Sequence, residues 1–206
     1  MQVLSVFATI RRMDFEIKII QFLQAGRTPF FDVSFEIISK VGSVLGAVAF
    51  FVFLLLFRKK LCFWWLFSYG FVFLTVNVMK ELVQRPRPYN LTDEVLSIGE
   101  AVMDYSFPSG HVACATAIAI FLGYFFFQQY KSKKARVWIV VACAVYVGLV
   151  ALSRMYLGKH YFTDIICGFA ISAFLCFCGI LLMRFYDKKK EKWKKERGLK
   201  GEKREN

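Results

Sequence analysis

The stretch Ser153–Asp164 places one of the two histidines of this chain beside groups suited to binding an anion. His160 and Asp164 are four residues apart, so on a helix their side chains would share one face. The carboxylate could accept a proton from one ring nitrogen and leave the other free as a base or nucleophile. Arg154, upstream of His160, carries a planar fork of donors that matches an oxyanion. The stretch therefore predicts a reaction centre.

The second histidine, His111, ends the motif Pro108-Ser109-Gly110-His111, which lies directly before an apolar run. Proline and serine are common at helix starts, and a simple helix cap would account for both. A helix that begins here would also point free backbone N–H groups outward, with Gly110 allowing a ligand to approach closely. We favour an anion site beside His111, because core packing explains a histidine at this position poorly.

Three cations, Lys80, Arg85 and Arg87, lie close together upstream of the His111 motif. Lys80 alone is typical of a cation that snorkels at the end of a membrane helix. The Arg-Pro-Arg-Pro sequence at residues 85–88 alone is typical of an extended linker, since each proline disfavours a helical conformation in the residue before it. Neither interpretation explains why three cations gather on the less basic side of the molecule.

Together these residues match the needs of phosphoryl transfer through a histidine. Cations and the N–H groups of a helix start stabilise the phosphoryl oxygens as negative charge spreads over them. One imidazole attacks phosphorus while the other protonates the leaving oxygen. A metal or other cofactor is not expected, because both histidines are already assigned and no cluster of outer carboxylates lies beside them. The predicted set, besides backbone amides, is Lys80, Arg87, Arg154, Ser109, His111, His160 and Asp164.

The elements that must position these motifs are long apolar runs, which indicate an integral membrane protein. Hydrophobic residues make up 57% of the chain, and 24 residues are phenylalanine. About 20 apolar residues cross the hydrocarbon core of a bilayer, and soluble domains rarely contain such runs. We expect an all-α, polytopic transmembrane helix bundle of five or six spans. The five runs cover residues 30–57, 61–83, 112–127, 137–152 and 162–183. Only residues 41–57 of the first are cleanly apolar, and Thr28-Pro29 before it predicts a helix start.

The pattern divides the chain into an N-terminal segment (1–28), a transmembrane domain (29–186) and a basic tail (187–206). In the first segment, large apolar residues recur at helical spacing among charged residues such as Glu16. This is typical of an amphipathic helix in the membrane interface, although a plainly packed helix fits almost as well. The tail carries ten Lys or Arg against five Asp or Glu, and we expect it to be solvated and partly disordered.

The formal net charge of +13 does not indicate a nucleic-acid-binding protein, because the basic residues gather in short loops and in the tail.

The loops at 58–60 and 131–136 and the tail fall on one side of the predicted bundle, which the positive-inside rule places in the cytoplasm. The motifs then lie on the outer face. The N-terminal segment would lie there too, against the rule, because it carries four basic residues. Either it lies on the outer interface despite its charge, or the span count is off by one.

The three motifs resemble the signature of the phosphatidic acid phosphatase type 2 superfamily of membrane lipid phosphatases. That signature is a lysine, six residues, then Arg-Pro; Pro-Ser-Gly-His; and Ser-Arg, five residues, His, three residues, Asp. The chain matches it at every fixed position: Lys80, Arg87-Pro88, Pro108-Ser109-Gly110-His111, Ser153-Arg154, His160 and Asp164. The motifs cover residues 80–164, and the layout of the spans extends the resemblance to about residue 186.

The resemblance implies a role for each matching residue. His160 would be the nucleophile that forms a phosphohistidine, Asp164 would orient it, and His111 would protonate the leaving group. The resemblance also implies an α-helical bundle, commonly of six spans, and no metal requirement. The residues that would hold the phosphate are Lys80, Arg87, Ser109, Gly110 and Arg154.

We therefore expect a metal-independent phosphatase or pyrophosphatase of a membrane lipid, such as a polyprenyl pyrophosphate, phosphatidylglycerophosphate or phosphatidate. A lipid phosphotransferase that uses the same site and a non-catalytic protein that binds or transports lipid phosphates are the alternatives. The expected location is a bacterial cytoplasmic membrane, with the active site on the extracytoplasmic face and the tail in the cytoplasm.

Overall fold

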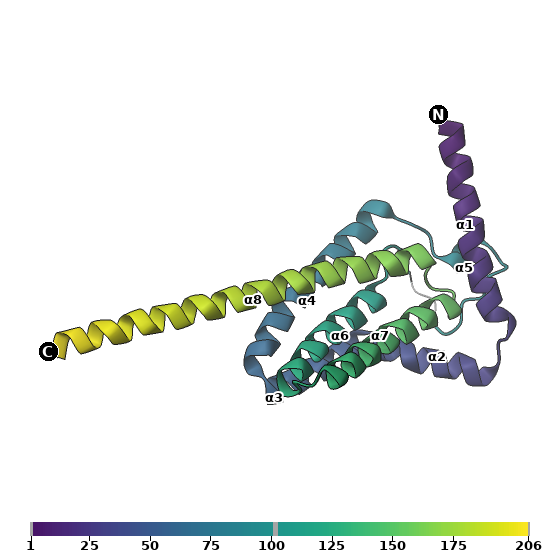
Figure 1. Cartoon of the computed structure of the whole chain (residues 1–206). Helices are drawn as coiled ribbons and strands as arrows, with labels where there is room; N and C mark the ends of the chain where they lie inside the picture. Colours follow the sequence, from purple (N-terminus) through teal and green to yellow (C-terminus); the bar gives the residue numbers. More distant parts are fainter. Residues whose placement is uncertain (1, 101–102, 206) are drawn as a thin grey trace.

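The computed structural model describes residues 2–100 and 103–205, with side chains for residues 14–100 and 103–197. Within these residues every regular element is an α-helix (Figure 1), as the apolar runs predict. In chain order the helices are α1 (Gln2–Ala25), α2 (Pro29–Val41), α3 (Val44–Phe57), α4 (Lys59–Val83), α5 (Pro88–Leu91), α6 (Gly110–Gln129), α7 (Lys133–Tyr156) and α8 (Phe162–Glu205).

The helix starts expected from the sequence are present, and side chains cap them. Thr28 Oγ1 accepts a hydrogen bond from the N–H of Phe31 at 3.3 Å, and Pro29 is the first residue of α2. Ser109 caps α6 in the same way, accepting from the N–H of Val112 at 3.5 Å. Each cap satisfies a backbone donor that the first turn leaves free, which contributes about 1 kcal/mol to stability.

Four of the described helices, α4, α6, α7 and α8, are long and apolar enough to cross a membrane, and α2 with α3 forms a fifth candidate. This fifth candidate is bent by 46°, so the run at 30–57 forms two helices and not one continuous helix. The bend falls at Gly42 and Ser43, between the polar and apolar halves of the run. Gly42 allows α6 and α7 to pack closely against the bend. A Cβ at this position would lie 2.5 Å from a methyl group of Val150 and 3.2 Å from the carbonyl oxygen of His111.

The central helix of the bundle is α6, which packs against α3, α4, α7 and α8. Small residues on α6, such as Ala113 and Ala117, are buried and let the neighbouring helices approach. Around them a core of large side chains from α3, α4 and α6 includes Leu54, Trp65 and Phe121, all nearly or fully buried.

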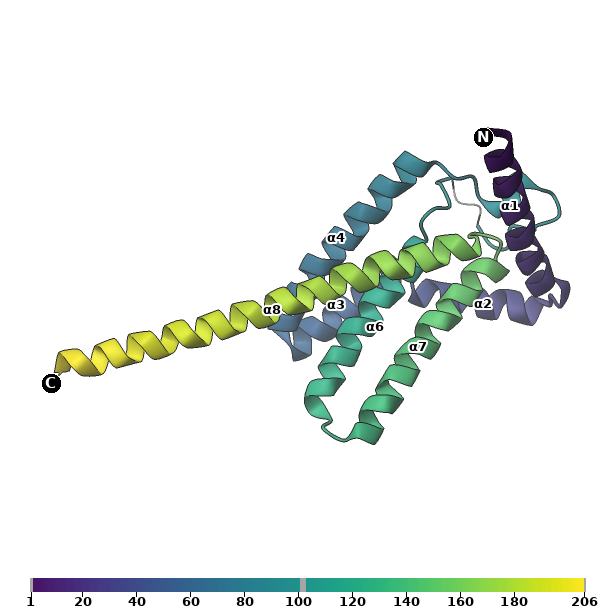
Figure 2. The ribbon, with the colours of Figure 1, turned by 45° about the horizontal axis from the view of Figure 1, so that its top comes forward.

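One end of the bundle gathers the last turns of α4 and α7, the first turns of α6 and α8, and the short helix α5 (Figures 1 and 2). The corner between α3 and α4 and the turn between α6 and α7 lie at the other end. We call these the site end and the distal end. All three sequence motifs lie at the site end, because each is next to one of the helix ends gathered there.

Helix α1 crosses the site end (Figure 1), and its packing corrects the expectation for one residue, Glu16. Glu16, expected on the polar face, is only 2% exposed, and Ile20 is buried on the same side of the helix. Phe15 and Phe22 are 63% and 80% exposed. The expectation for Glu16 was wrong because its carboxylate finds hydrogen-bond donors inside the protein, which offset the cost of burying a charge.

The basic tail continues α8 as one helix to Glu205, where the sequence suggested a partly disordered segment (Figure 1). Its lysines, glutamates and arginines are good helix formers, so the composition that disfavours a packed core still favours a helix. Pairs spaced four apart add to this, such as Lys192 with Glu196, whose charged atoms lie 4.0 Å apart.

Candidate active site

A cavity of about 310 Å³ at the site end brings together six of the eight predicted site residues. They are Lys80, Arg87, Gly110, His111, Arg154 and His160. The other two, Ser109 and Asp164, are fully buried next to this cavity without lining it. They contact each other, since the N–H of Ser109 donates to the main-chain oxygen of Asp164 at 3.0 Å. The three motifs therefore converge in space.

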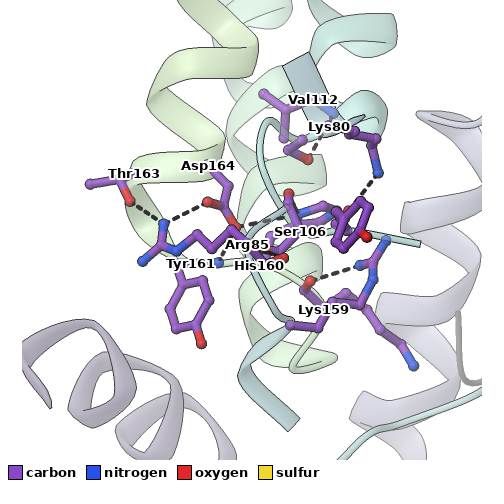
Figure 3. Close-up of polar contacts among 12 residues, drawn as sticks. Lys80, Arg85, Ser106, Val112, Lys159, His160, Tyr161, Thr163 and Asp164 are labelled. Atoms are coloured by element: carbon purple, nitrogen blue, oxygen red, sulfur yellow. Dashed lines mark hydrogen bonds and ion pairs between the residues drawn. The ribbon is translucent and has the colours of Figure 1, made fainter. Parts of the chain in front are cut away.

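The hydrogen bonds of His160 determine which of its ring nitrogens can react. Nδ1 lies 2.7 Å from the main-chain oxygen of Ser106 (Figure 3). A carbonyl oxygen can only accept, so Nδ1 carries the proton and Nε2 keeps a free lone pair. The sequence assigned this acceptor role to Asp164, but Asp164 Oδ2 lies 3.6 Å from Nδ1, beyond direct hydrogen-bonding distance. The Ser106 carbonyl holds the ring, and Asp164 acts on it from farther away.

The protonation state of His160 follows from its surroundings. Burial lowers its pKa well below the ordinary value, and the positive charges of Arg154, Arg87 and Lys80 lower it further. The hydrogen bond to the Ser106 carbonyl raises the pKa but does not offset these effects. His160 is therefore neutral at neutral pH, which is the form that a nucleophile requires.

Arg85 connects Asp164 to the N-terminal helix, and Figure 3 shows its contacts with Asp164 and Thr163. One guanidinium nitrogen donates to Asp164 Oδ1 at 2.6 Å and to Thr163 Oγ1 at 2.7 Å. The other donates to Glu16 Oε2 at 2.6 Å, and the Tyr161 ring lies 3.8 Å from the guanidinium carbon. Glu16 also accepts from the N–H and the hydroxyl group of Thr163, both at 2.7 Å, so it caps the first turn of α8. Helix α1 thus supports the carboxylate behind His160.

Sequence reasoning missed Arg85, Glu16 and Ser106 as parts of the site. The repeated Arg-Pro pair was a signal for Arg85, but the family signature singled out Arg87. Glu16 gave no local signal, because its partners Arg85 and Thr163 lie 69 and 147 residues away in the chain. Ser106 acts on His160 through its main chain, which every residue type possesses, so its identity could not mark it.

Asp104, in the loop before α6, pairs with two of the cavity cations. Its carboxylate forms ion pairs with Lys80 and Arg87, and Arg87 also donates to its main-chain oxygen at 3.0 Å. Burial raises the pKa of Asp104, but the hydrogen bonds from Lys80 and Arg87 outweigh this, so the pKa lies below its ordinary value. The ionised carboxylate therefore occupies donors that a phosphate would use. This residue, too, was missed from the sequence.

Arg154 is held in the cavity wall with part of its guanidinium unsatisfied. It is 5% exposed, and one terminal nitrogen donates to Ser39 Oγ at 2.5 Å. Its Nε has no hydrogen-bond partner among the residues that the structure describes. A buried charged donor without an acceptor is costly. An anion in the cavity would supply that acceptor.

The start of α6 reaches the cavity because α8 approaches it closely at a glycine. A Cβ at Gly168 would lie 2.5 Å from the main-chain oxygen of Ser109. The close contact places Gly110 and His111, in the first turn of α6, in the cavity wall. A helix start carries free N–H groups and a partial positive charge, so this wall favours an anion.

Lys159, which the sequence left without a role, fixes the loop beside the site. Its Nζ donates to Ser97 Oγ and to the main-chain oxygen of Glu100, each at 2.7 Å. Burial, with the charges of Arg154 and Arg87, lowers the pKa of Lys159 to about 8. The main-chain oxygen of Lys159 accepts from Arg87 at 2.8 Å, so this residue holds both the loop and a cavity cation in place.

Comparison with known protein families agrees with this arrangement. The family model described as the PAP2 superfamily matches residues 61–191, which is more than half of the chain. The chain belongs to the PAP2 superfamily. The resemblance carried by the three motifs is thereby confirmed.

Among PAP2 relatives, a lipid A 4'-phosphatase of Porphyromonas gingivalis is 30% identical over 178 residues, covering 80% of this chain and 70% of that protein. Phosphatidylglycerophosphatase B of Bacillus subtilis is 31% identical over 122 residues, covering 58% and 55%. An undecaprenyl-diphosphatase of Sulfolobus acidocaldarius is 27% identical over 104 residues, covering 50% and 46%. The chain thus matches about half the length of the last two relatives.

Two crystal structures share the fold. One is a transmembrane PAP2-type phosphatidylglycerolphosphate phosphatase from Bacillus subtilis, with a TM-score of 0.71 at 24% identity over 90% of this chain and 96% of that one. The other is LpxE of Aquifex aeolicus, with a TM-score of 0.67 at 24% identity over 79% and 93%. With the apolar helices described above, these likenesses identify an integral membrane protein of the PAP2 fold.

Proposed function

We propose that this PAP2 protein is a membrane lipid phosphatase that releases phosphate from a lipid phosphomonoester or pyrophosphate through a phosphohistidine on His160. One observation carries the proposal. The cavity combines a neutral histidine, whose Nε2 is free, with a second histidine and three cations. The relatives named above are phosphatases of lipid phosphates or lipid diphosphates, which supports the same reaction class.

In the proposed mechanism the phosphate lies among Lys80, Arg87 and Arg154, which stabilise the charge on its oxygens as the transition state forms. His160 Nε2 attacks phosphorus, the bond from phosphorus to the leaving oxygen breaks, and His111 gives that oxygen a proton. Water then attacks the phosphohistidine, and His111 takes up a proton from this water. The negative charge of the bound phosphate favours the protonated form of His111 that the first step requires.

The proposal includes no metal requirement, and the donors in the cavity support this. The carboxylate that lines the cavity, Asp104, is paired with Lys80 and Arg87. The oxygens of Asp164 are bonded to Arg85 and to the N–H of Tyr161. These carboxylates are thus engaged with donors, and the positive charges around them disfavour a cation.

The apolar part of the cavity wall supports a lipid substrate. Val44 of α3 and Phe73 of α4 line the cavity and are also exposed on the surface of these membrane helices. Tyr69 and Val76 of α4 line it as well and are more buried. A headgroup could therefore reach the cations from the bilayer between α3 and α4, with its hydrocarbon chain against these side chains.

The proposed substrates are polyprenyl pyrophosphates, phosphatidylglycerophosphate and phosphatidate, to which the first relative adds lipid A. The proposed location is a bacterial cytoplasmic membrane with the site end on the extracytoplasmic face, α1 on the outer interface and the basic tail in the cytoplasm. The basic segments at 58–60 and 131–136, which lie at the distal end, support this orientation.

Phosphate release by purified protein in detergent tests the function directly. The panel would hold the four lipid classes named above, with product identification and with or without EDTA. We expect at least one substrate to release inorganic phosphate at a rate that EDTA leaves unchanged. Loss of activity with EDTA would contradict the metal-free mechanism. Binding without release across the panel, or transfer of phosphate to an acceptor other than water, would contradict hydrolysis.

The low pKa of His160 predicts activity that persists into acid. The nucleophile must be neutral, so the acidic limb of the kcat/KM profile should lie below pH 6.5, the ordinary histidine value. Removing a neighbouring cation, as in Lys80→Met, should raise the pKa of His160. The acidic limb of the kcat/KM profile, measured on the activity that remains, should then move to higher pH. A limb unchanged in Lys80→Met would contradict this assignment.

Asp104 should compete with phosphate for Lys80 and Arg87. In Asp104→Asn this competition is lost, so we expect inhibition by inorganic phosphate to become several-fold tighter, roughly 3- to 10-fold because the carboxylate is partly exposed. Asp93→Asn, which removes an exposed charge from the same loop, should change the inhibition constant little. Weaker inhibition in Asp104→Asn would show instead that Asp104 holds the cations in place for phosphate.

A further inference from the structure

A second cavity, of about 780 Å³, lies at the distal end of the bundle. We call it the distal cavity. Its wall includes the first turn of α4, the last turns of α6 and a middle turn of α8. Lys60 in its wall and Lys80 in the active-site cavity lie on the same helix, about 30 Å apart at 1.5 Å per residue. The two cavities therefore lie near opposite ends of this candidate membrane helix.

The lining of the distal cavity is strongly positive. Among the described residues that line the cavity, one is acidic, Asp187, and it forms an ion pair with Lys60. The basic lining residues are Arg58, Lys59, Lys60, Arg136 and Arg184. A formal surplus of four positive charges thus lines one open cavity, where the field of each cation adds to the others.

The remaining wall of the distal cavity, apart from Gln128, is mainly apolar and aromatic. Leu61 and Met183 belong to the buried core of the bundle, and Phe125 packs against that core. Two cations rest on aromatic rings: the guanidinium carbon of Arg58 lies 5.8 Å from the ring centre of Phe125, and that of Arg136 lies 5.7 Å from that of Phe127. Such a wall suits a molecule that is anionic at one end and apolar at the other.

The first turn of α4 adds donors to this wall. Arg58 precedes the helix without capping it through its side chain. The N–H groups at the start of a helix then remain available for an anion, and the helix dipole favours negative charge there. Lys59, Lys60 and Leu61, which form this turn, all line the distal cavity.

We propose that the distal cavity binds the phosphate headgroup of an anionic phospholipid from the leaflet that faces the distal end. A volume of this size accommodates such a headgroup, and basic cavities between membrane helices bind anionic headgroups. Membrane topology alone requires basic residues in the loops but gives no reason for them to converge on one cavity. Arg184 in particular lies within α8 and not in a loop.

Native mass spectrometry of the full chain in detergent tests this proposal, with phosphatidylglycerol, phosphatidylcholine and inorganic phosphate as probes. The test variant, Arg58→Gln/Arg136→Gln/Arg184→Gln, removes three cations from the distal cavity. The matched control, Lys131→Gln/Lys133→Gln/Lys134→Gln, removes the same charge from the adjacent turn, outside the cavity lining. Thermal unfolding without added lipid checks that each variant is folded.

We expect the wild type and the control to retain phosphatidylglycerol in preference to phosphatidylcholine, and the test variant to bind phosphatidylglycerol at least tenfold more weakly. If phosphatidylglycerol binding is weakened equally in the test variant and the control, the effect is due to the overall positive charge of this end, and the proposal is overturned. Unchanged binding in the test variant would overturn it as well. Binding of inorganic phosphate that the test variant weakens as much as that of phosphatidylglycerol would overturn the assignment to a lipid. If the triple variant does not fold, the single variants Arg136→Gln and Arg184→Gln replace it. Each is expected to weaken phosphatidylglycerol binding at least threefold, and the same outcomes would overturn the proposal.

Discussion

Replacing His160 with alanine should lower kcat for lipid phosphate hydrolysis by roughly 10⁴-fold or more, because no other group can form the covalent intermediate. The change removes a buried ring and the hydrogen bond to Ser106, so the fold must be checked by thermal unfolding. His160→Asn keeps an amide N–H at the position of Nδ1, where it can donate to the Ser106 carbonyl. It should be folded and equally inactive. A His160→Asn protein with more than one hundredth of wild-type activity would contradict the nucleophile assignment.

His111→Ala should behave differently, because His111 acts first as the acid and then as the base and forms no bond to phosphorus. Loss of a general acid should lower kcat/KM about 10²- to 10⁴-fold for a substrate with a poor leaving group. With p-nitrophenyl phosphate, whose leaving group departs without a proton, the loss in kcat/KM should be much smaller. His160→Ala should be inactive with both substrates. A His111→Ala defect that is equal for both substrates would place His111 outside the acid role.

Removing Arg85 should have a large effect of another kind, on the fold of the site. Arg85 is the cation between two buried carboxylates, Glu16 and Asp164. Its loss leaves both without a guanidinium, and breaking a buried pair in this way costs about 3–5 kcal/mol. We expect Arg85→Ala to lower the thermal unfolding midpoint in detergent by several degrees and to reduce kcat. Arg85→Lys should recover little of the lost stability and activity, since one ammonium group cannot bind both carboxylates at once.

Two variants separate this specific role from a general loss of charge. Arg27→Ala removes the arginine from a more exposed pair with Asp32, and it should change stability and activity little. In Glu16→Gln the cap on α8 is weakened while Arg85 still holds Asp164, so the loss should be smaller than in Arg85→Ala. A stable and fully active Arg85→Ala protein would contradict the account of α1 as a support for the site.

The convergence of the motifs was predictable because each stands at the end of an apolar run. Runs long enough to cross a bilayer must alternate direction, so Lys80, His111 and His160 had to fall on the same side. Short-range rules also predicted the caps at Thr28 and Ser109, since a capping side chain acts within three residues. These parts of the fold depend on local sequence and on membrane geometry.

What could not be predicted depends on contacts between distant residues and on the main chain. The burial of Glu16 follows from its contacts with Arg85 and Thr163, which no local pattern encodes. Asp104 lies in a loop without a recognisable motif, yet it pairs with Lys80 and Arg87. The 46° bend between α2 and α3 reflects packing of the chain against α6 and α7, although Gly42 marks the place.

Rapid-quench trapping of the phosphorylated enzyme tests the central claim most directly. The protein would be mixed with lipid substrate labelled in the phosphoryl group, quenched in base within one turnover and mapped by mass spectrometry. We predict an acid-labile phosphoramidate on His160 that forms no more slowly than the leaving alcohol or phosphate appears. A label on any other residue, or a burst of leaving group with no label on the protein, would contradict the mechanism.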